Sequence, residues 1–438
     1  MIRYLILGTL LLAGATQGWA QTTDVGVPVG ATDQPMVAPP PVNTGGESVA
    51  FTSEMEKSNY LRGGVSFQGA YSDNVFNSTP AQSDETYTIL PTIAFDMTRS
   101  RLQWDLNYSP GFTLYQNFTS ENQVDHIFST NLQYRMSPHV TLTLQDNLAK
   151  TPSFSGLLQP GSITSTTVVQ TPAFFVAPAL IDTLSNNGSG QVTYQFAPNE
   201  MLGFGGSSSQ LYYLGDVQTP GLSDSNERGA QAFYEYRLGG KHYFGMNYDF
   251  QDMVSHPINL DTQVHSGTLF YTFYLNQRVS FSLFGGAQHA DTEGAGFPSL
   301  VSWSPTEGGG LNLQGVHNGL ALNASRTINA GGGLEGPVRS YSANAAFRHQ
   351  FTPNLNGTIE GVYSQNDVLQ LAGLPNIKGN TFLFSGSLHR SFGRHFSAEL
   401  GYSRINQNYK NVPAVSSNPD VDRAWVTVSY QFERPLGR

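Results

Sequence analysis

The chain has 438 residues, a formal net charge of −10 and no cysteine, which excludes disulfides and thiolate metal sites. The negative charge argues against nucleic-acid binding, because such binding depends on lysine and arginine. Only 12% of the residues are charged, whereas a soluble domain usually has about 25%, and the 12% aromatic residues and 46 glycines fit a transmembrane β-barrel.

The first twenty residues are typical of a secretory signal peptide. Arg3 supplies a positive charge, an apolar run follows from residue 4 to residue 12, and small residues precede a cleavage site after Ala20. This run is too short to favour a membrane anchor, and no later stretch of about 20 apolar residues could form a spanning helix. We therefore predict an exported protein whose mature chain begins at Gln21.

Residues 21–58 form a segment of different composition. They show no periodicity and contain the run Pro39, Pro40 and Pro41 among Gly, Thr and Ser residues. Such a composition predicts an extended, flexible periplasmic segment or linker. Both a simple tether and a partner-binding tail or small plug remain open.

Residues 59–432 repeat one pattern, in which apolar and polar side chains alternate over runs of about 9–15 residues. One example has Phe244, Met246 and Tyr248 alternating with Asn247 and Asp249. Period-two alternation predicts β-strands with one apolar face and one wetter face. The length of each run is sufficient for a tilted membrane strand.

The connections between these runs alternate in length. Short turns are predicted at residues 98–101, 137–139, 197–200, 239–241, 276–278, 316–318, 352–354 and 393–395, and longer loops near residues 72, 119, 151, 215, 254, 290, 330, 366 and 410. Eight turns and nine loops make seventeen connections and eighteen strands. We therefore predict an all-β, transmembrane, antiparallel up-and-down barrel of about 18 strands with both termini periplasmic. A soluble propeller or solenoid is the alternative, but its recurring motif is missing.

The last predicted strand, residues 424–432, carries Val428, Tyr430 and Phe432 on one face. This spacing resembles the C-terminal signal that the outer-membrane assembly machinery reads. Together with the signal peptide and the repeated strands, it makes the chain resemble the outer-membrane β-barrel porin superfamily, and most of all the β-barrel porins encoded beside exopolysaccharide synthesis genes. The resemblance implies the outer membrane of a Gram-negative bacterium, with its lipids and the barrel-assembly machinery as partners. The tail at residues 433–438 departs from the family, whose signal usually ends the chain.

Charged residues at the polar positions of the strands are the candidates for lining a channel. They are Asp96, Asp105, Arg135, Glu235, Arg237, Asp249, Arg348, Glu360 and Glu399. Six acidic residues against three arginines give a weak acidic excess, which would favour cations or polar neutral solutes. Charge ladders that brace adjacent strands are the other interpretation, because half-buried charges are usually paired.

The longest predicted loop, residues 151–182, is apolar. Its candidate constriction residues are Phe154, Leu157, Leu158, Phe174, Phe175 and the single carboxylate Asp182. An apolar segment of this length is unfavourable in water, so it should fold inward, lie on the lipid interface or contact a partner. By position and length it resembles the third loop of general porins, which folds into the barrel and narrows the pore, and this favours a constriction or gate.

The sequence therefore predicts a porin-like channel for small polar solutes or saccharides. Export of a polysaccharide with periplasmic partners and a non-transporting structural or adhesion barrel are the alternatives. No H-E-x-x-H, P-loop or G-x-S-x-G motif occurs, so we predict no enzyme activity, no catalytic residue, no metal site and no cofactor. The substrate and the oligomeric state are left open.

Overall fold

The computed structural model describes residues 59–152, 181–214, 222–257, 259–276, 278–294, 297–329, 333–334, 336–369, 376–412 and 420–435. The predicted signal peptide (residues 1–20) and the segment 21–58 lie outside these residues. So do five constriction candidates, namely Phe154, Leu157, Leu158, Phe174 and Phe175.

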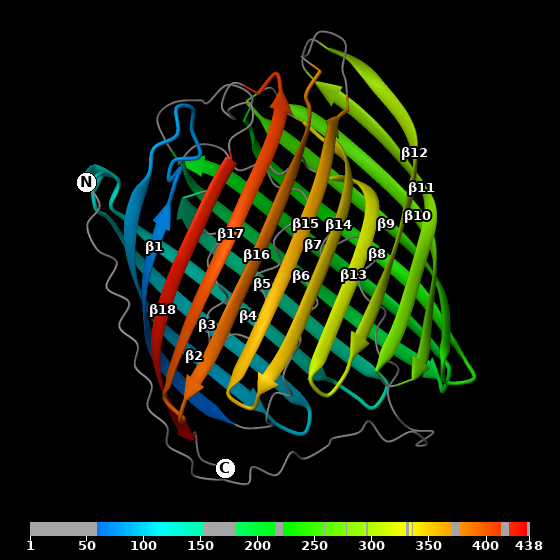
Figure 1. Cartoon of the computed structure of the whole chain (residues 1–438). Helices are drawn as coiled ribbons and strands as arrows, with labels where there is room; N and C mark the ends of the chain where they lie inside the picture. The colour runs from blue at the N-terminus through cyan, green and yellow to red at the C-terminus, as the bar shows by residue number, and fades with distance from the viewer. Residues whose placement is uncertain are drawn as a thin grey trace. The chain divides into compact units, whose positions relative to one another are not determined.

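The described residues form one closed antiparallel sheet of 18 strands, which confirms the predicted all-β, antiparallel up-and-down barrel. The periplasmic position of both termini stays a prediction. Each strand pairs with the next one along the chain, and β1 pairs with β18 to close the ring (Figure 1). The strands are β1 (Tyr60–Ser72), β2 (Asp84–Thr98), β3 (Leu102–Tyr115), β4 (Gln123–Arg135), β5 (Val140–Pro152), β6 (Asp182–Ala197), β7 (Glu200–Leu214), β8 (Asp224–Leu238), β9 (His242–His256), β10 (Leu260–Asn276), β11 (Val279–Gly294), β12 (Phe297–Gln314), β13 (Asn318–Asn329), β14 (Val338–Thr352), β15 (Leu355–Val368), β16 (Lys378–Phe392), β17 (Phe396–Lys410) and β18 (Asp420–Pro435). A short 3₁₀ helix, Thr119–Glu121, lies between β3 and β4.

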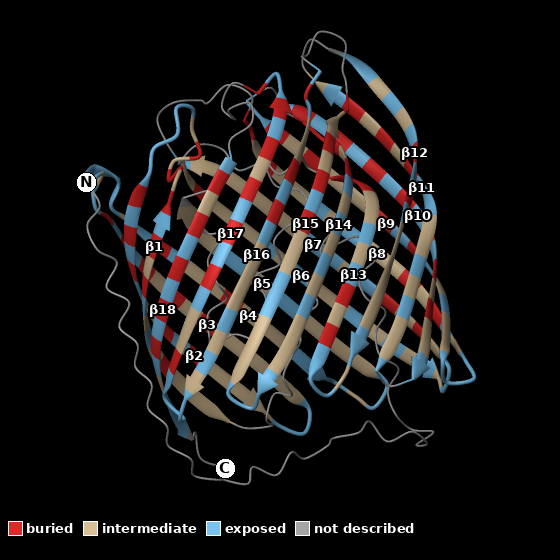
Figure 2. Cartoon of the chain, viewed as in Figure 1, coloured by how far each residue is buried: buried red, intermediate tan, exposed pale blue. Residues whose placement is uncertain are grey.

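The period-two pattern places apolar side chains outside and polar side chains inside. On β2, Ile89 and Ile93 are exposed, whereas Thr88 and Thr92 are buried. The inner hydroxyl of Thr88 bonds that of Thr113 on β3 at 3.1 Å. Buried residues are most frequent toward one end of the strands (Figure 2). The inner face is thus a wall of small polar residues that bond to one another across the strands.

The two ends of the barrel differ in their connections. All eight predicted short turns are found between strands, at the end that we call the turn end. Tyr60 pairs with Pro435 there, so the first strand begins and the last strand ends at the turn end. The other end, which we call the loop end, holds the remaining connections.

Two predicted long loops are wrong. Near residue 254, β9 continues to His256 and β10 begins at Leu260, and near residue 290, β11 continues to Gly294 and β12 begins at Phe297. In both places the outward residues become polar while backbone pairing continues, so polarity alone did not mark the strand ends. The last strand also extends further than predicted, because residues 433–435 pair with β1 instead of forming a separate tail.

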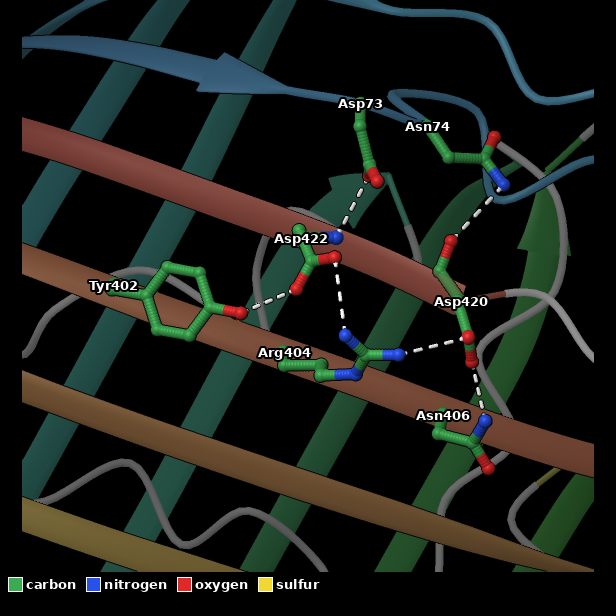
Figure 3. Close-up of polar contacts among 7 residues, drawn as sticks. All are labelled: Asp73, Asn74, Tyr402, Arg404, Asn406, Asp420 and Asp422. Carbon is green, nitrogen blue, oxygen red and sulfur yellow. Dashed lines mark hydrogen bonds and ion pairs between the residues drawn. The ribbon is translucent and has the colours of Figure 1, made fainter.

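A polar network on the outer side joins β17 and β18 at the loop end (Figure 3). Arg404 Nη2 lies 2.9 Å from Asp420 Oδ2, and Arg404 Nη1 lies 3.4 Å from Asp422 Oδ2. The hydroxyl of Tyr402 donates to Asp422, and the amide of Asn406 donates to Asp420. One guanidinium therefore bridges two carboxylates of the neighbouring strand, a charge-assisted arrangement.

The same network reaches the two residues that follow β1, where the ring closes. The backbone N–H of Asp422 donates to Asp73 Oδ1 at 2.8 Å, and Asn74 Nδ2 donates to the carbonyl of Asp420 at 3.5 Å (Figure 3). Inside the wall, Gln68 Nε2 donates to Thr427 Oγ1 at 3.1 Å. Side chains on both faces thus add to the backbone ladder between the first and last strands.

Candidate functional site: the barrel lumen

All nine predicted lining residues lie on the inner face. In an antiparallel ladder, directly paired residues share a face, and the register connects each of them to inner positions of its neighbours. Glu235 and Asp249 are buried, Arg135 is exposed, and the other six have intermediate exposure. Their position on the inner face follows the predicted alternation, and their contribution to a conducting pore stays a prediction.

Two of these residues belong to a charge ladder. Asp96 and Asp105 are register partners on β2 and β3. Arg62 on β1 places its Nε 3.0 Å from Asp96 Oδ2 and 3.7 Å from Glu433 Oε1 on β18. Arg62 therefore braces three strands near the turn end, as the ladder interpretation predicts. Arg62 and Glu433 are not among the predicted lining residues, although both occupy inner positions of the same alternation.

Other predicted residues have local partners in the wall. Trp425 Nε1 donates to Glu399 Oε1 at 3.2 Å. Arg237 Nη2 donates to the carbonyl of Pro198 at 2.8 Å, and its Nε donates to Asn199 Oδ1 at 3.1 Å, so this arginine anchors the turn between β6 and β7. Glu399 and Arg237 are therefore held by the wall rather than free in the lumen.

Glu235 is different, because its carboxylate is 1% exposed and, among the described residues, its Oε1 has no hydrogen-bond partner. It is the register partner of Met201, which packs with Phe233 and Tyr243. Arg135, Arg348 and Glu360 take part in none of the ion pairs between described side chains.

The inner face carries six charged residues that are not among the predicted lining residues. The additional carboxylates are Asp84, Asp125, Glu227 and Glu433, and the additional arginines are Arg62 and Arg423. Together with the six predicted carboxylates and three predicted arginines, the inner face carries ten carboxylates and five arginines. All six follow the same alternation of inward and outward residues, so this pattern alone could have identified them. The acidic excess of the interior is therefore larger than predicted.

Two connections meet across the loop end. Leu222 and Leu334 form an isolated antiparallel bridge between the β7–β8 connection and the β13–β14 connection. The N–H of Ser223 donates to the carbonyl of Gly333, and its hydroxyl donates to the carbonyl of Leu334, both at 2.9 Å. A side chain at position 333 would collide with the hydroxyl of Tyr213, so glycine permits this approach.

The bridge belongs to a buried apolar group, which we call the loop-end cluster. Its members are Leu222, Leu334, Val338, Ile377, Tyr409 and Val412, with Ile181, Tyr213 and Val368 packed against them. They come from the β6–β8 wall and from the β14–β17 wall, which are separate in the ring order. The loop-end cluster therefore joins two sides of the barrel through apolar contacts. The one sequence feature that could have indicated this cluster is Leu334, an apolar residue in a predicted polar loop.

The structure corrects the prediction for Asp182. This residue begins β6, pairs with Pro152 and lies on the outward face, because the next residue, Thr183, faces inward and is buried. Its Oδ2 lies 3.8 Å from Lys150 Nζ on the neighbouring strand. β5 ends at Pro152 and β6 begins at Asp182, so both ends of the predicted loop belong to strands and Asp182 is part of the outer wall.

The outer face carries an apolar belt edged by aromatic rings. On β11 the outward residues from Phe281 to His289 are uncharged, and Asp291 follows. Eight residues at about 3.3 Å each, on a strand tilted by about 40°, span roughly 20 Å of height. The ring of His289 lies 4.7 Å from that of Trp303, and at the other edge the rings of His242 and Phe273 are 4.8 Å apart.

None of the described residues forms a helix that is long and apolar enough to cross a membrane. Among the described residues, no group of three or more His, Asp or Glu side chains is arranged to hold a metal ion.

No family model matches the chain, and no curated protein matches it. Solved structures show a distant likeness. OccK2 (OpdF) of Pseudomonas aeruginosa is 13% identical, with 86% of this chain and 98% of that chain covered, at a TM-score of 0.43. OccAB4 of Acinetobacter baumannii is 12% identical, with 86% and 99% covered, at 0.42. The ferric citrate transporter FecA in its unliganded form is 10% identical, with 86% and 79% covered, at 0.46.

Proposed function

We propose that the chain is an outer-membrane channel that passes small polar solutes, including saccharides, through its lumen. The observation that carries this proposal is the division of the wall, with exposed apolar residues outside and polar residues inside a closed ring of 18 strands. An exposed apolar belt is unfavourable in water and favourable in lipid. A ring of this size encloses more space than its own side chains can fill.

The inner face of β5–β7 supports an open interior. Gln145, Asn187, Ser189 and Ser207 belong to the inward positions of these strands and are exposed. Their amides and hydroxyls can exchange hydrogen bonds with water and with sugar hydroxyls. A non-transporting barrel would instead bury these groups along the whole wall.

The charge of the interior favours cations and neutral polar solutes over anions. Ten inner carboxylates against five arginines produce a negative potential, and low-dielectric walls strengthen it. The Arg62 ladder neutralises part of this excess near the turn end. We expect a moderate cation preference that weakens at high salt.

The loop-end cluster acts as the gate in this proposal. Leu334 and Val338 have no exposed surface, and their contacts join opposite walls. Displacement of the β13–β14 connection would widen the lumen at the loop end without any movement of the wall strands. With the usual orientation of such barrels, the turn end and both termini face the periplasm and the longer loops face outward.

Recognition of Val428, Tyr430 and Phe432 by the assembly machinery stays a prediction; all three are exposed on the outer face of β18. Polysaccharide export with periplasmic partners depends on residues 21–58, which lie outside the described residues.

Reconstitution tests the proposed function. The full mature protein is inserted into planar bilayers and liposomes, and single-channel current and sugar-dependent swelling are recorded. We expect conductance that increases when the loop-end cluster is disrupted by Leu334→Asp. The proposal would be overturned if neither the unmodified protein nor Leu334→Asp conducted ions or sugars.

A further inference from the structure

The outer face of β5–β7 differs from the rest of the apolar belt. Six outward positions there are small or polar, and we call them the belt patch: Asp146, Asn186, Gly188, Gly190, Gly206 and Ser208. On β17 and β18 the corresponding outward residues include Leu400, Val426 and Val428, which are large, apolar and exposed. One side of the belt therefore lacks the side chains that suit lipid.

Asp146 lies within the belt rather than at its edge. On the outward face of β5 it stands between Leu144 and Leu148, which are 43% and 38% exposed. Leu142 is the register partner of Tyr134 near the turn end, and Asp146 is four residues further along β5. Four residues on a tilted strand correspond to a height of about 10 Å, well inside an apolar band of about 25 Å.

The carboxylate of Asp146 has no cationic partner among the described residues. Its Oδ1 accepts a hydrogen bond from Asn186 Nδ2 at 3.1 Å, and Asn186 is itself outward-facing. A polar pair at this depth is unfavourable against lipid tails, which offer no donor. A covering that supplies polar contacts would therefore stabilise the belt patch in the membrane.

A groove runs over the belt patch. It has a volume of about 600 Å³ and is lined by the glycines of β6 and β7 together with Trp104, Leu132 and Leu144. Glycines allow another backbone or side chain to approach the wall closely. The groove therefore has a largely apolar lining that includes the carboxylate of Asp146, to which the Asn186 amide donates.

We propose that the belt patch is the surface through which a second copy of this chain packs within the membrane. The inference rests on the proposed membrane location. A lipid chain could fill the groove but would offer Asp146 no donor beyond Asn186 of its own wall. A second copy brings the Ser208 hydroxyl and the Asn186 amide of the same patch, and closed symmetry lets one surface serve both copies. Packing within the bilayer depends on small residues and on such interhelical or interstrand hydrogen bonds.

Cysteine cross-linking tests this contact in the full chain, which has no native cysteine. Ser208→Cys places a thiol on the belt patch. Leu400→Cys is the matched control, because it lies on the far wall, four residues from Phe396, whose ring is 4.9 Å from Tyr430 near the turn end. Mild oxidation in membranes should yield a covalent dimer with Ser208→Cys and none with Leu400→Cys. No dimer with Ser208→Cys, or equal dimer with both, would overturn the proposal.

Filling the groove provides a second measurement. A Cβ at Gly206 would have its nearest neighbouring atom at 3.4 Å, an ordinary contact, so Gly206→Leu can begin its side chain without a backbone clash while it blocks close approach. Gly386→Leu, with a nearest atom at 3.7 Å on the outward face of β16, is the control. Light scattering in detergent should show an oligomer for the unmodified protein and for Gly386→Leu, and a monomer for Gly206→Leu.

A monomeric unmodified protein, with or without lipid in the groove, would overturn this inference. So would an oligomer that persists in Gly206→Leu. Conductance measured on the same samples separates the two proposals. A monomer that conducts would contradict only the proposed packing surface. An oligomer that does not conduct would contradict only the proposed channel function.

Discussion

Leu222 and Leu334 pair as an isolated antiparallel bridge although 111 residues separate the neighbouring Ser223 from Leu334. Leu334 is 0% exposed, and the contact joins two connections that belong to different sides of the ring. The lumen is therefore not an unobstructed tube at the loop end. In the proposed channel, the position of the bridged residue Leu334 would decide how wide the loop end is.

The first prediction concerns the apolar character of this bridge. Leu334→Asp buries a carboxylate among apolar side chains, which is unfavourable and should displace the connection. Single-channel conductance should rise several-fold while the barrel remains folded. Val316→Asp, at a highly exposed position in a short turn, should leave conductance unchanged. Equal conductance in Leu334→Asp and the unmodified protein would contradict the gating role.

The second prediction locks the same bridge. Directly paired antiparallel residues have Cα atoms about 4.5–5.5 Å apart, within the range of about 4.4–6.8 Å that a disulfide allows. The double variant Leu222→Cys/Leu334→Cys should therefore form a disulfide under mild oxidation. Oxidised channels should open rarely and recover on reduction. The single variants serve as controls, and a redox-insensitive current in the double variant would show that the bridge does not gate.

The third prediction concerns ion selectivity. Glu360→Gln removes an inner carboxylate that has no ion-pair partner among the described residues, so cation preference should fall. One charge at about 4 Å is worth about 1 kcal/mol in water, so the permeability ratio should change by less than roughly fivefold. Asp261→Asn, on the outward face of β10, should not change the ratio. Reversal potentials in a salt gradient measure it, and identical shifts for both variants would argue against an inner-face origin.

The fourth prediction concerns the Arg62 ladder. Arg62→Ala leaves Asp96 without its cation and next to Asp105, so it should lower stability by about 2 kcal/mol, between the values for exposed and buried pairs. Arg434→Ala, one strand away on the outward face, should have an effect near zero. The temperature at which the folded barrel loses its anomalous electrophoretic mobility measures this. Equal transition temperatures would show that the ladder adds no stability.

Sequence periodicity predicted the local features well. Strand number, the eight short turns and the inner position of all nine candidate residues follow from alternation, because successive side chains of a pleated strand point to opposite faces of the sheet. Two loop positions were wrong because pairing between β9 and β10 and between β11 and β12 continues where the outward face becomes polar.

Long-range features could not be predicted in the same way. The loop-end cluster depends on contacts between connections that are distant in sequence, such as Leu222 with Leu334 and Tyr409 with Asn366. Alternation assigns a face to each residue but does not say which loops meet. Asp182 was assigned to a loop because the start of β6 has no apolar run to mark it.

The most direct test of the account is single-channel recording of the unmodified mature protein in a planar bilayer, followed by the same recording on Leu334→Asp. We expect discrete, weakly cation-selective openings whose size increases in the variant. A protein that stays dissolved without detergent and inserts no conducting unit in either form would contradict it.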